Sequence, residues 1–504
     1  MKLNLKKMLA TILATISVFG MVACAPSTSQ SAETTPPDYS ASTKQLTTYG
    51  YTPPPSNRVI DGGTYNFATE KRYKEYLEAG LNVLLLQVDD HYNGNEPWED
   101  SALKKKMDAA QRAGIERVIM VDYRLFNLHN TSALYPSSQF EDEAELDTYV
   151  ANCMKDYINH PVFYGLQLRD EPSYQYFDCM GQLYKAIKKY GNSQNKDVFV
   201  QINLLPMDQG NDNRGRYCKE VADTLDEAYK LYLTDFLDST GADYIMFDSY
   251  PMRPKGIQAE HYRTLKTITD LAKERGVDVY AVAQTCSFKP KGANEWTVRI
   301  CDEEDLYFQL NLYMGMGIKQ ISYFNYWKKA NSDSEDFADE ASFITNDGNK
   351  TEIYSIMQNM HKEMQSLAKV LMNFDYKNAY CIRGEINDHK TSHLAAFGKN
   401  QLSAMTQLKA VKIKEHQSIF ITELYDEEKD YYMYMIQNAL DPKDVLNAED
   451  YSYDYDINGL NAELTFDKGN LLVIDKGVQA TEKLENNTYS ISLAAGQAVF
   501  VIPY

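Results

Sequence analysis

From about residue 58, short β-rich runs alternate with longer amphipathic helical runs, and this alternation limits the fold more than any other feature. Several helical runs end at a glycine, such as Gly114 or Gly276, which favours a left-handed cap before the next strand. Eight strand–helix units make a (β/α)₈ barrel, whereas open doubly wound sheets usually have fewer. We therefore predict an α/β fold with a TIM barrel over residues 58–375. The eight strands are expected at 58–62, 82–89, 117–123, 163–170, 198–204, 244–250, 279–285 and 320–326.

After about residue 376 the helical pattern stops and short alternating runs take over. They lie at 392–397, 418–423, 431–438, 462–466, 471–475 and 489–493. Closely spaced alternating runs are typical of a β-sandwich, so we predict an all-β sandwich domain over residues 376–504.

The first 24 residues have the form of a targeting segment: three lysines, an apolar run at 8–21 too short to span a bilayer, and then Met21-Val22-Ala23-Cys24. This end resembles a bacterial lipoprotein signal, which implies a lipidated Cys24 and an extracytoplasmic protein anchored to the cell membrane by lipid. An ordinary secretory signal with an incidental cysteine is the alternative. The Ser/Thr/Pro-rich residues 25–57 are predicted to be a disordered tether.

The net charge and the motifs of the sequence limit which kinds of partner and cofactor we expect the protein to bind. The net charge of −20, from 51 basic and 71 acidic residues, argues against nucleic acid and against anionic membrane surfaces, so membrane contact is expected only through the N-terminal lipid. No Cys-x-x-Cys pair occurs, and His129 and His160 lack metal-ligand spacing. No glycine-rich phosphate loop is present. We predict neither a metal nor a cofactor.

Polar and aromatic residues gather where the predicted strands end. The apolar run before Glu171 ends in Arg169-Asp170-Glu171-Pro172, and burying charges costs several kcal/mol unless they are paired or used. Strand side chains alternate between faces, and the C-terminal ends of barrel strands carry catalytic groups. Counting by twos places Arg169 and Gln167 on the face of Glu171. The predicted binding residues are Gln87, Asp89, Asp122, Arg169, Gln201, Asn203, Tyr250, Gln284, Asn325 and Trp327.

At these strand ends the chain resembles a known superfamily. Asp170-Glu171-Pro172 is similar to the Asn-Glu-Pro that ends strand four of clan A glycoside hydrolases, where the glutamate is the general acid/base. Asp248-Ser249-Tyr250-Pro251 and Asn325-Tyr326-Trp327 are similar to segments of β-galactosidase-like barrels. The resemblance implies a carbohydrate substrate, a C-terminal sandwich beside the barrel, and Glu171 as general acid/base.

The second carboxylate departs from that pattern. Clan A has a nucleophilic glutamate at the end of strand seven, where this chain has Gln284, and a neutral amide cannot be that nucleophile. Asp248 on the neighbouring strand is our first choice as nucleophile or base. Alternatively, Asp170 and Glu171 act together while the substrate's own acetamido group attacks, as in hexosaminidase-type enzymes, with Tyr250 assisting. In the third interpretation the barrel binds sugar without cutting it.

The sequence thus predicts a surface-anchored glycoside hydrolase of extracellular oligo- or polysaccharides, with Glu171, Asp248 and Asp170 as catalytic residues. A glycan-binding barrel lipoprotein without catalysis is one alternative, and Gln284 is the feature in its favour. The other is a solute-binding lipoprotein of a transporter, which would fold as two hinged lobes.

Overall fold

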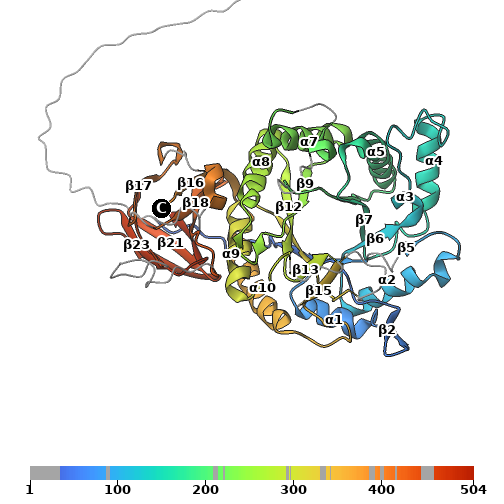
Figure 1. Ribbon diagram of the computed structural model, residues 1–504, viewed down its shortest axis with the longest axis horizontal. Helices are drawn as coiled ribbons and strands as arrows, with labels where there is room; N and C mark the ends of the chain where they lie inside the picture. Colours follow the sequence, from blue (N-terminus) through green and yellow to red (C-terminus); the bar gives the residue numbers. More distant parts are fainter. Residues whose placement is uncertain are drawn as a thin grey trace, which may run out of the picture. The chain divides into compact units, whose positions relative to one another are not determined.

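A computed structural model describes residues 35–86, 91–207, 214–218, 222–290, 295, 297–329, 337–340, 342–384, 392–397, 402–414, 417–443 and 459–504. Parallel strands surround a central axis in its first part (Figure 1). In chain order they are β1 (Thr47–Gly50), β4 (Leu84–Leu85), β6 (Val118–Asp122), β7 (Phe163–Asp170), β8 (Phe199–Asn203), β9 (Tyr244–Asp248), β12 (Asp278–Gln284) and β14 (Gln320–Phe324).

Two ladders of parallel strands close into the barrel. One has the order β1-β14-β12-β9 and the other β4-β6-β7-β8. A parallel bridge between Leu204 and Phe247 joins β8 to β9, and the backbone N–H groups of Asn82 and Val83, just before β4, donate to the Thr48 carbonyl of β1. The strand order confirms the predicted (β/α)₈ barrel.

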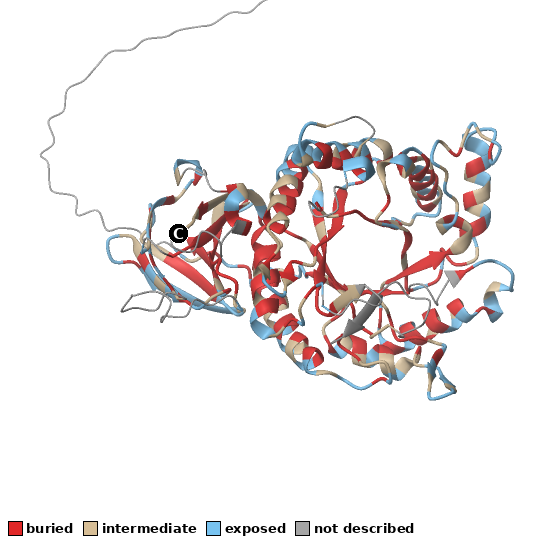
Figure 2. Ribbon diagram, in the orientation of Figure 1, coloured by how far each residue is buried: buried red, intermediate tan, exposed pale blue. Residues whose placement is uncertain are grey.

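Helices lie outside the strands (Figure 1), with their buried residues facing inward (Figure 2). Local sequence sets where they start and stop: Thr224 and Glu227 form a capping box at one start, and Gly241 and Gly276 close two ends with φ of 70° and 67°. The helices are α1 (Glu70–Glu78), α2 (Ala102–Ala113), α4 (Glu143–Met154), α5 (Phe177–Ser193), α7 (Leu225–Thr240), α8 (Glu260–Arg275), α9 (Glu303–Gly315) and α10 (Glu352–Leu371).

The first barrel strand differs from the prediction. β1 lies within residues 25–57, which we assigned to a disordered tether, and it pairs in parallel with β14. The expected first strand is instead a hairpin of β2 (Arg58–Ile60) and β3 (Gly63–Tyr65). Proline-rich flanks hide β1 in the sequence, but Tyr49 is fully buried and provides the burial that fixes the strand. Cys24 and residues 25–34 lie outside the described residues.

The predicted β-sandwich is confirmed. A six-stranded antiparallel sheet, β16-β18-β19-β24-β21-β22, faces a three-stranded sheet, β17-β20-β23, across its own apolar core. The strands are β16 (Asp375–Ile382), β17 (Leu408–Lys412), β18 (Ile419–Asp426), β19 (Tyr431–Asn438), β20 (Leu460–Phe466), β21 (Asn470–Asp475), β22 (Val478–Lys483), β23 (Thr488–Leu493) and β24 (Ala498–Pro503).

One run of the sandwich was wrongly predicted as a strand. Residues 392–397 form the 3₁₀ helix η3 (Ser392–Phe397). Leu394 and Phe397 are three residues apart and both buried, a spacing that a three-residue turn places on one side. Phe397 packs against Phe420, with ring centroids 4.9 Å apart.

The second face of the six-stranded sheet shares a core with the barrel. Apolar side chains of this face, including Phe420, Met435 and Phe500, belong to the same buried cluster as the barrel, and α9 packs against β18, β19 and β24. Arg299 beside α9 pairs with Asp305 at 2.5 Å and with Asp441, which follows β19, at 2.7 Å. None of the helices among the described residues is long and apolar enough to cross a membrane.

Candidate active site

A β-bulge in β7 sets which side chains face the barrel mouth. Gln167 pairs with Gln201 and Asp170 pairs with Asn203, so one extra residue, at Leu168, lies between them. A bulge reverses the alternation of faces, and the simple count by twos therefore fails here. Asp170 lies on the face of Gln167, and the Asn203 side chain donates to it at 3.0 Å. Arg169 instead lies over the rings of Phe126 and Tyr176, outside the mouth.

The backbone then turns sharply at Glu171. Its φ of 42° is left-handed, which is uncommon for a residue with a side chain. Three hydrogen bonds hold the turn: the Glu171 N–H donates to the Asn203 carbonyl at 2.8 Å, Arg216 donates to the Glu171 carbonyl at 3.0 Å, and the Tyr232 hydroxyl donates to the Pro172 carbonyl at 2.6 Å. Because the chain leaves the extended conformation here, two consecutive acidic side chains, Asp170 and Glu171, reach the same site.

Glu171 and Asp248 form a hydrogen-bonded carboxyl pair at the C-terminal ends of β7 and β9. Burial is the main cause that raises the pKa of Asp248 well above its usual value, and the charges of Glu171 and Asp170 add to it. Burial and the charge of Asp170 also raise the pKa of Glu171, while Asp248 and Arg216 oppose that shift. Asp248 is only 4% exposed and Glu171 is half-buried, so a proton shared by this carboxyl pair resides mainly on Asp248.

Asp170 completes a carboxyl cluster of Asp170, Glu171 and Asp248. Its carboxylate is accessible at the mouth but surrounded by protein atoms, and partial desolvation raises its pKa. The hydrogen bond from Asn203 and the charge of Lys329 oppose the shift. Three carboxyl groups so close together cannot all be ionised without strong repulsion, so the cluster retains a proton at a higher pH than isolated carboxyl groups would.

Hydrogen-bond acceptors without a partner lie in the carboxyl cluster and beside it. The side-chain oxygens Gln167 Oε1, Asn203 Oδ1 and Asp248 Oδ1 are buried without a hydrogen-bond partner. Buried polar atoms are usually hydrogen-bonded, so three open acceptors at one end of the barrel favour a ligand that carries hydroxyl or N–H donors. A sugar has such donors on every ring.

Aromatic side chains flank the cluster. Tyr250 follows β9, and its pKa is raised first by burial and then by the charges of the three carboxyl groups. Its ring lies against Phe288 at 5.3 Å and Phe324 at 5.5 Å. Tyr51 follows β1 and is 4% exposed, with its hydroxyl accepting a hydrogen bond from Gln201 at 2.9 Å.

Four predicted binding residues have their side chains engaged elsewhere in the structure. Besides Arg169, these are Asp122, Gln284 and Trp327. Asp122 is buried, accepts from the Arg124 guanidinium at 3.1 and 2.8 Å, and accepts from the Tyr157 hydroxyl at 3.0 Å. Gln284 is fully buried, and its amide bonds to the backbone of Met252 and Arg299.

Trp327 belongs to the core. It is fully buried, packs on Phe67 with ring centroids 4.8 Å apart, and donates its indole N–H to the Asn346 carbonyl at 3.4 Å. Asn325 is also fully buried and accepts a hydrogen bond from Ser342. Gln201 is used within the barrel, between Tyr49 and Tyr51. Gln87 and Asp89 lie outside the described residues.

Sequence reasoning missed two residues of the site, Tyr51 and Arg216. Tyr51 stands at the end of a barrel strand, so the strand-end rule would have found it had the first strand been placed at β1. Arg216 lies on the short helix α6 (Arg214–Tyr217) after β8, and no motif marks it. Within the described part of the chain, no group of three His, Cys, Asp or Glu side chains has the arrangement of a metal site.

Comparison with known proteins gives information only about the architecture of this chain. No family model matches the sequence, and neither does any curated protein. The structure is similar to glycoside hydrolase barrel enzymes with a C-terminal antiparallel sheet domain. An Anoxybacillus α-amylase matches with a TM-score of 0.47 and 12% identity, over 91% of this chain and 97% of that one.

Two further solved structures are of the same kind. A GH27 β-L-arabinopyranosidase from Geobacillus stearothermophilus matches with a TM-score of 0.45 and 9% identity, over 92% of this chain and 97% of that one. A β-glucuronidase from Ruminococcus gnavus in complex with a C6-substituted uronic isofagomine matches with a TM-score of 0.39 and 13% identity, over 63% and 50%. With TM-scores below 0.5 these likenesses say nothing about the reaction, and the barrel is established by its own strand order.

Proposed function

We propose that this protein is a glycoside hydrolase of extracellular oligo- or polysaccharides, with Glu171 as general acid/base and Asp248 as the second carboxylate. The observation that carries the proposal is the desolvated, hydrogen-bonded pair of Glu171 and Asp248 at the C-terminal mouth of the barrel. Catalytic groups of such barrels stand at this end. The open acceptors of Gln167 and Asn203 support a ligand rich in hydroxyl groups.

The chemistry needs one protonated and one ionised carboxyl group. A glycosidic bond breaks through an oxocarbenium-like state, in which an acid protonates the leaving oxygen while a carboxylate balances the developing positive charge or activates water. A carboxyl pair that shares a single proton contains both forms. When the proton passes from Asp248 to Glu171 across their hydrogen bond, Glu171 becomes the acid and Asp248 the carboxylate.

The stereochemical outcome follows from how substrate separates this pair. Retaining glycosidases hold their two carboxyl groups about 5–5.5 Å apart and inverting ones roughly 6.5–9.5 Å apart. Glu171 and Asp248 share a side-chain hydrogen bond. The separation that they adopt around a bound substrate decides between retention and inversion, and proton NMR of the first-formed sugar anomer reports the outcome.

The position of Asp170 favours one variant of this reaction. Asp170 acts on both members of the carboxyl pair through its charge, and Asn203 fixes one of its oxygens. In a substrate-assisted reaction Asp170 would accept a hydrogen bond from the N–H of an acetamido group while the acetamido oxygen attacks. Asp170→Asn should then abolish cleavage of N-acetylated substrates only.

The first test replaces Glu171 by Gln, which keeps the shape and removes the transferable proton. General acid catalysis is worth about 10²–10⁴-fold, so kcat on aryl glycosides with poor leaving groups should fall by that order. Substrates with very good leaving groups need less protonation and should lose less. Asp248→Asn should impair both kinds, because a base or nucleophile is needed in either case.

Glu423→Gln is the matched control. Glu423 is a buried glutamate in the sandwich, where it accepts from the Tyr434 hydroxyl at 2.7 Å, remote in the chain from the carboxyl cluster. Its replacement should leave kcat unchanged in the folded protein. If the parent cleaves nothing in a broad aryl-glycoside panel yet binds glycans, the chain is a binding barrel. A parent that does neither would refute both functions.

We also propose that the enzyme is held at the cell surface through a lipid on Cys24. The basic start, the short apolar run and the Met-Val-Ala-Cys end of the segment support this. Mass spectrometry of the mature N-terminus should find a diacylglyceryl-modified cysteine at residue 24. An unmodified N-terminus that begins elsewhere would rule the anchor out.

A further inference from the structure

The amide of Gln284, at the end of β12, makes hydrogen bonds that a carboxylate could not make. Its Oε1 accepts from the Met252 N–H at 2.9 Å, while its Nε2 donates to the Arg299 carbonyl at 2.9 Å and to the Met252 carbonyl at 3.4 Å. A backbone N–H only donates and a backbone carbonyl only accepts, so these partners fix the orientation of the amide. An ionised glutamate in this place would turn an oxygen toward two carbonyl oxygens.

Arg299 holds the same part of the chain. Its backbone N–H donates to the Met252 carbonyl at 2.9 Å, and its guanidinium pairs with Asp305 at 2.5 Å and with Asp441 at 2.7 Å. Because the guanidinium is fixed by two carboxylates, the backbone of Arg299 is a firm support for Met252. Gln284 thus bonds to two backbone segments that are already bonded to each other.

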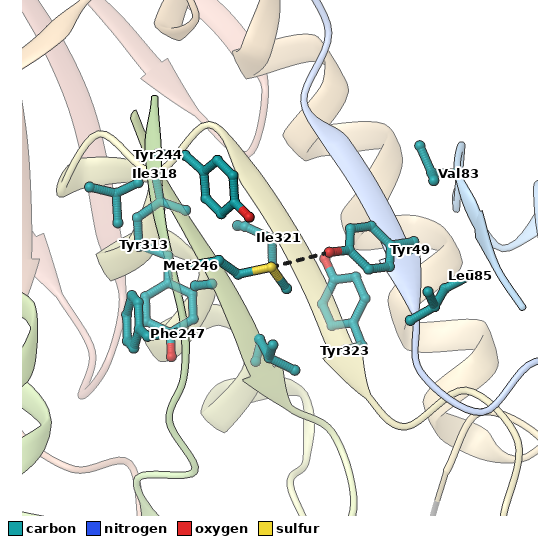
Figure 3. Close-up of a cluster of buried hydrophobic side chains, with 14 of the residues drawn as sticks. Tyr49, Val83, Leu85, Tyr244, Met246, Phe247, Tyr313, Ile318, Ile321 and Tyr323 are labelled. Atoms are coloured by element: carbon teal, nitrogen blue, oxygen red, sulfur yellow. Dashed lines mark hydrogen bonds between the residues drawn. The ribbon is translucent and has the colours of Figure 1, made fainter. Parts of the chain in front are cut away.

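The chain that these bonds hold runs from Asp248 to Met252 at the barrel mouth. At its start, Tyr313 of α9 packs beside β9 (Figure 3), and its hydroxyl donates to the Ser249 carbonyl at 3.4 Å. At its end, Met252 is fully buried and bonded to the Gln284 amide. Between these two fixed points lies Tyr250, one of the aromatic residues that flank the carboxyl cluster.

We propose that Gln284 is a positioning residue, whose neutral amide holds the chain after β9 so that Asp248 and Tyr250 keep their places in the site. The inference rests on the proposed function, because it takes the carboxyl cluster as the reactive site. This strand end needs a donor toward Arg299 and an acceptor toward Met252. An amide supplies both at every pH, and a carboxyl group supplies both only while it is protonated.

Gln284→Glu tests the inference with a minimal change of shape. At neutral pH the introduced carboxylate has no proton to donate to the Arg299 carbonyl. The folded variant should lose kcat by up to about 10²-fold, as expected when reacting groups are displaced by about 1 Å. As the pH falls, the introduced group takes up a proton and can again donate and accept. The ratio of variant kcat to parent kcat should therefore rise toward low pH.

The charged and titratable side chains on the elements around Gln284 disfavour an ionised carboxylate there. They are Asp248 on β9, Asp305 and Tyr313 on α9, Cys286, Arg299, Cys301 and, after β19, Asp441. Arg299 carries the positive charge among them, and it is already paired with two carboxylates. Burial and the neighbouring carboxylates should raise the pKa of the introduced carboxyl group above its ordinary value, so the recovery begins in the mildly acidic range.

Two further variants separate positioning from packing. Gln284→Met fills a similar volume without these hydrogen bonds, so its kcat should fall with no recovery at low pH. Gln437→Glu is the matched control. Gln437 on β19 is also fully buried, and its amide donates to the carbonyls of Phe308 at 3.0 Å and Gly496 at 3.4 Å. This control should lose stability while its folded fraction keeps kcat.

A rise of kcat in Gln284→Glu at neutral pH, the result expected if this strand end merely lacked a nucleophile, overturns the inference. So does an equal loss of kcat in Gln437→Glu, or a kcat ratio of Gln284→Glu that does not change with pH. If circular dichroism shows that Gln284→Glu does not fold at neutral pH, Gln284→Met decides, and an undiminished kcat in that variant is contrary.

A measurement without substrate separates this inference from the proposed hydrolase. Hydrogen exchange of the full-length protein at neutral pH, read by mass spectrometry, follows the backbone amides of residues 249–258. These amides should exchange faster in Gln284→Glu and Gln284→Met than in the parent, and at the parent rate in Gln437→Glu. Faster exchange in a protein that cleaves no glycoside supports the role of Gln284 while the hydrolase fails. Unchanged exchange in both folded Gln284 variants overturns the inference whatever the activity.

Discussion

Asp248 shows how one buried acidic residue can lower the stability of the folded chain as the pH rises. Its pKa in the folded protein lies well above the usual value of 3.8, because it is buried beside two other carboxyl groups. Below pH 3.8 the residue is protonated in both folded and unfolded chains, and the folded state keeps its full stability. As pH rises from there toward the folded pKa, the unfolded chain releases its proton first. The free energy of unfolding therefore falls.

Asp248→Asn should accordingly raise the melting temperature near neutral pH. The amide stays neutral at every pH and can donate to Glu171, so the burial cost of the charge disappears. A gain of about 1 kcal/mol corresponds to roughly 1 °C in a cooperative unit as large as residues 36–504. Differential scanning fluorimetry between about pH 4 and pH 8 should show the advantage of the variant shrinking as pH falls.

Asp122→Asn is the contrasting control. Burial also raises the pKa of Asp122, but its carboxylate pairs with Arg124 at 2.8 Å. Its loss leaves the partly buried Arg124 guanidinium without its carboxylate partner, and breaking a buried ion pair costs about 3–5 kcal/mol in typical proteins. The melting temperature of this variant should drop at neutral pH. A drop for Asp248→Asn as well would contradict our account of Asp248.

At this scale, the sequence predicts which residues lie near the mouth better than what each one does. Glu171, Asp170 and Asp248 meet as expected, because strand ends are readable from apolar runs that stop at charges. Gln284 and Trp327 fit the same rule and yet are buried among backbone groups and aromatic rings. A polar residue at a strand end carries no sign of the partner that three-dimensional packing brings to it.

At the scale of elements, β7 fits against β8 through a glycine. A Cβ on Gly165 would lie 2.1 Å from the Phe199 carbonyl oxygen, so Gly165→Ala must push the two strands apart. Such overpacking typically costs about 1–3 kcal/mol. Because Asp170 and Glu171 stand at the end of the displaced strand, the variant should also lose activity per folded molecule, measured by active-site titration and chemical denaturation.

A second glycine, Gly181, provides a control for the Gly165→Ala variant. A Cβ on Gly181 would meet the Ser239 carbonyl oxygen at 2.3 Å, where α5 packs against α7. Gly181→Ala should lose comparable stability while the folded fraction keeps its activity. Equal losses of activity in both variants would show that β7 has no special link to the site.

The bulge in the same strand limits what sequence alone can predict. Counting faces by twos assumes an unbroken ladder, and Leu168 breaks it without a glycine or proline to mark the place. The assignment of Arg169 to the mouth was wrong for this reason. β1 was missed for a different reason. Its four residues lie between Pro- and Ser-rich segments and give too short a pattern to be recognised as a strand.

At the scale of the whole molecule, the barrel and the sandwich stabilise each other through α9. We expect residues 36–504 to unfold in one calorimetric transition, because a single apolar cluster spans both parts. A chain cut after residue 375 would expose the side of α9 that packs on β18, β19 and β24, and it should be insoluble or lack near-ultraviolet circular dichroism. Two separate transitions, or a soluble barrel with native spectra, would be the contrary result.

The shared core also bears on how such a protein can change over generations. A module joined by a linker can be lost, duplicated or exchanged without harm to its neighbour, but a sheet that forms part of the barrel's packing cannot. β24 lies in the middle of the six-stranded sheet, between β19 and β21, so a loss from this strand would cost each of these neighbours one of its two strand partners. Descendants of this chain should vary at the barrel mouth and inherit barrel and sandwich together.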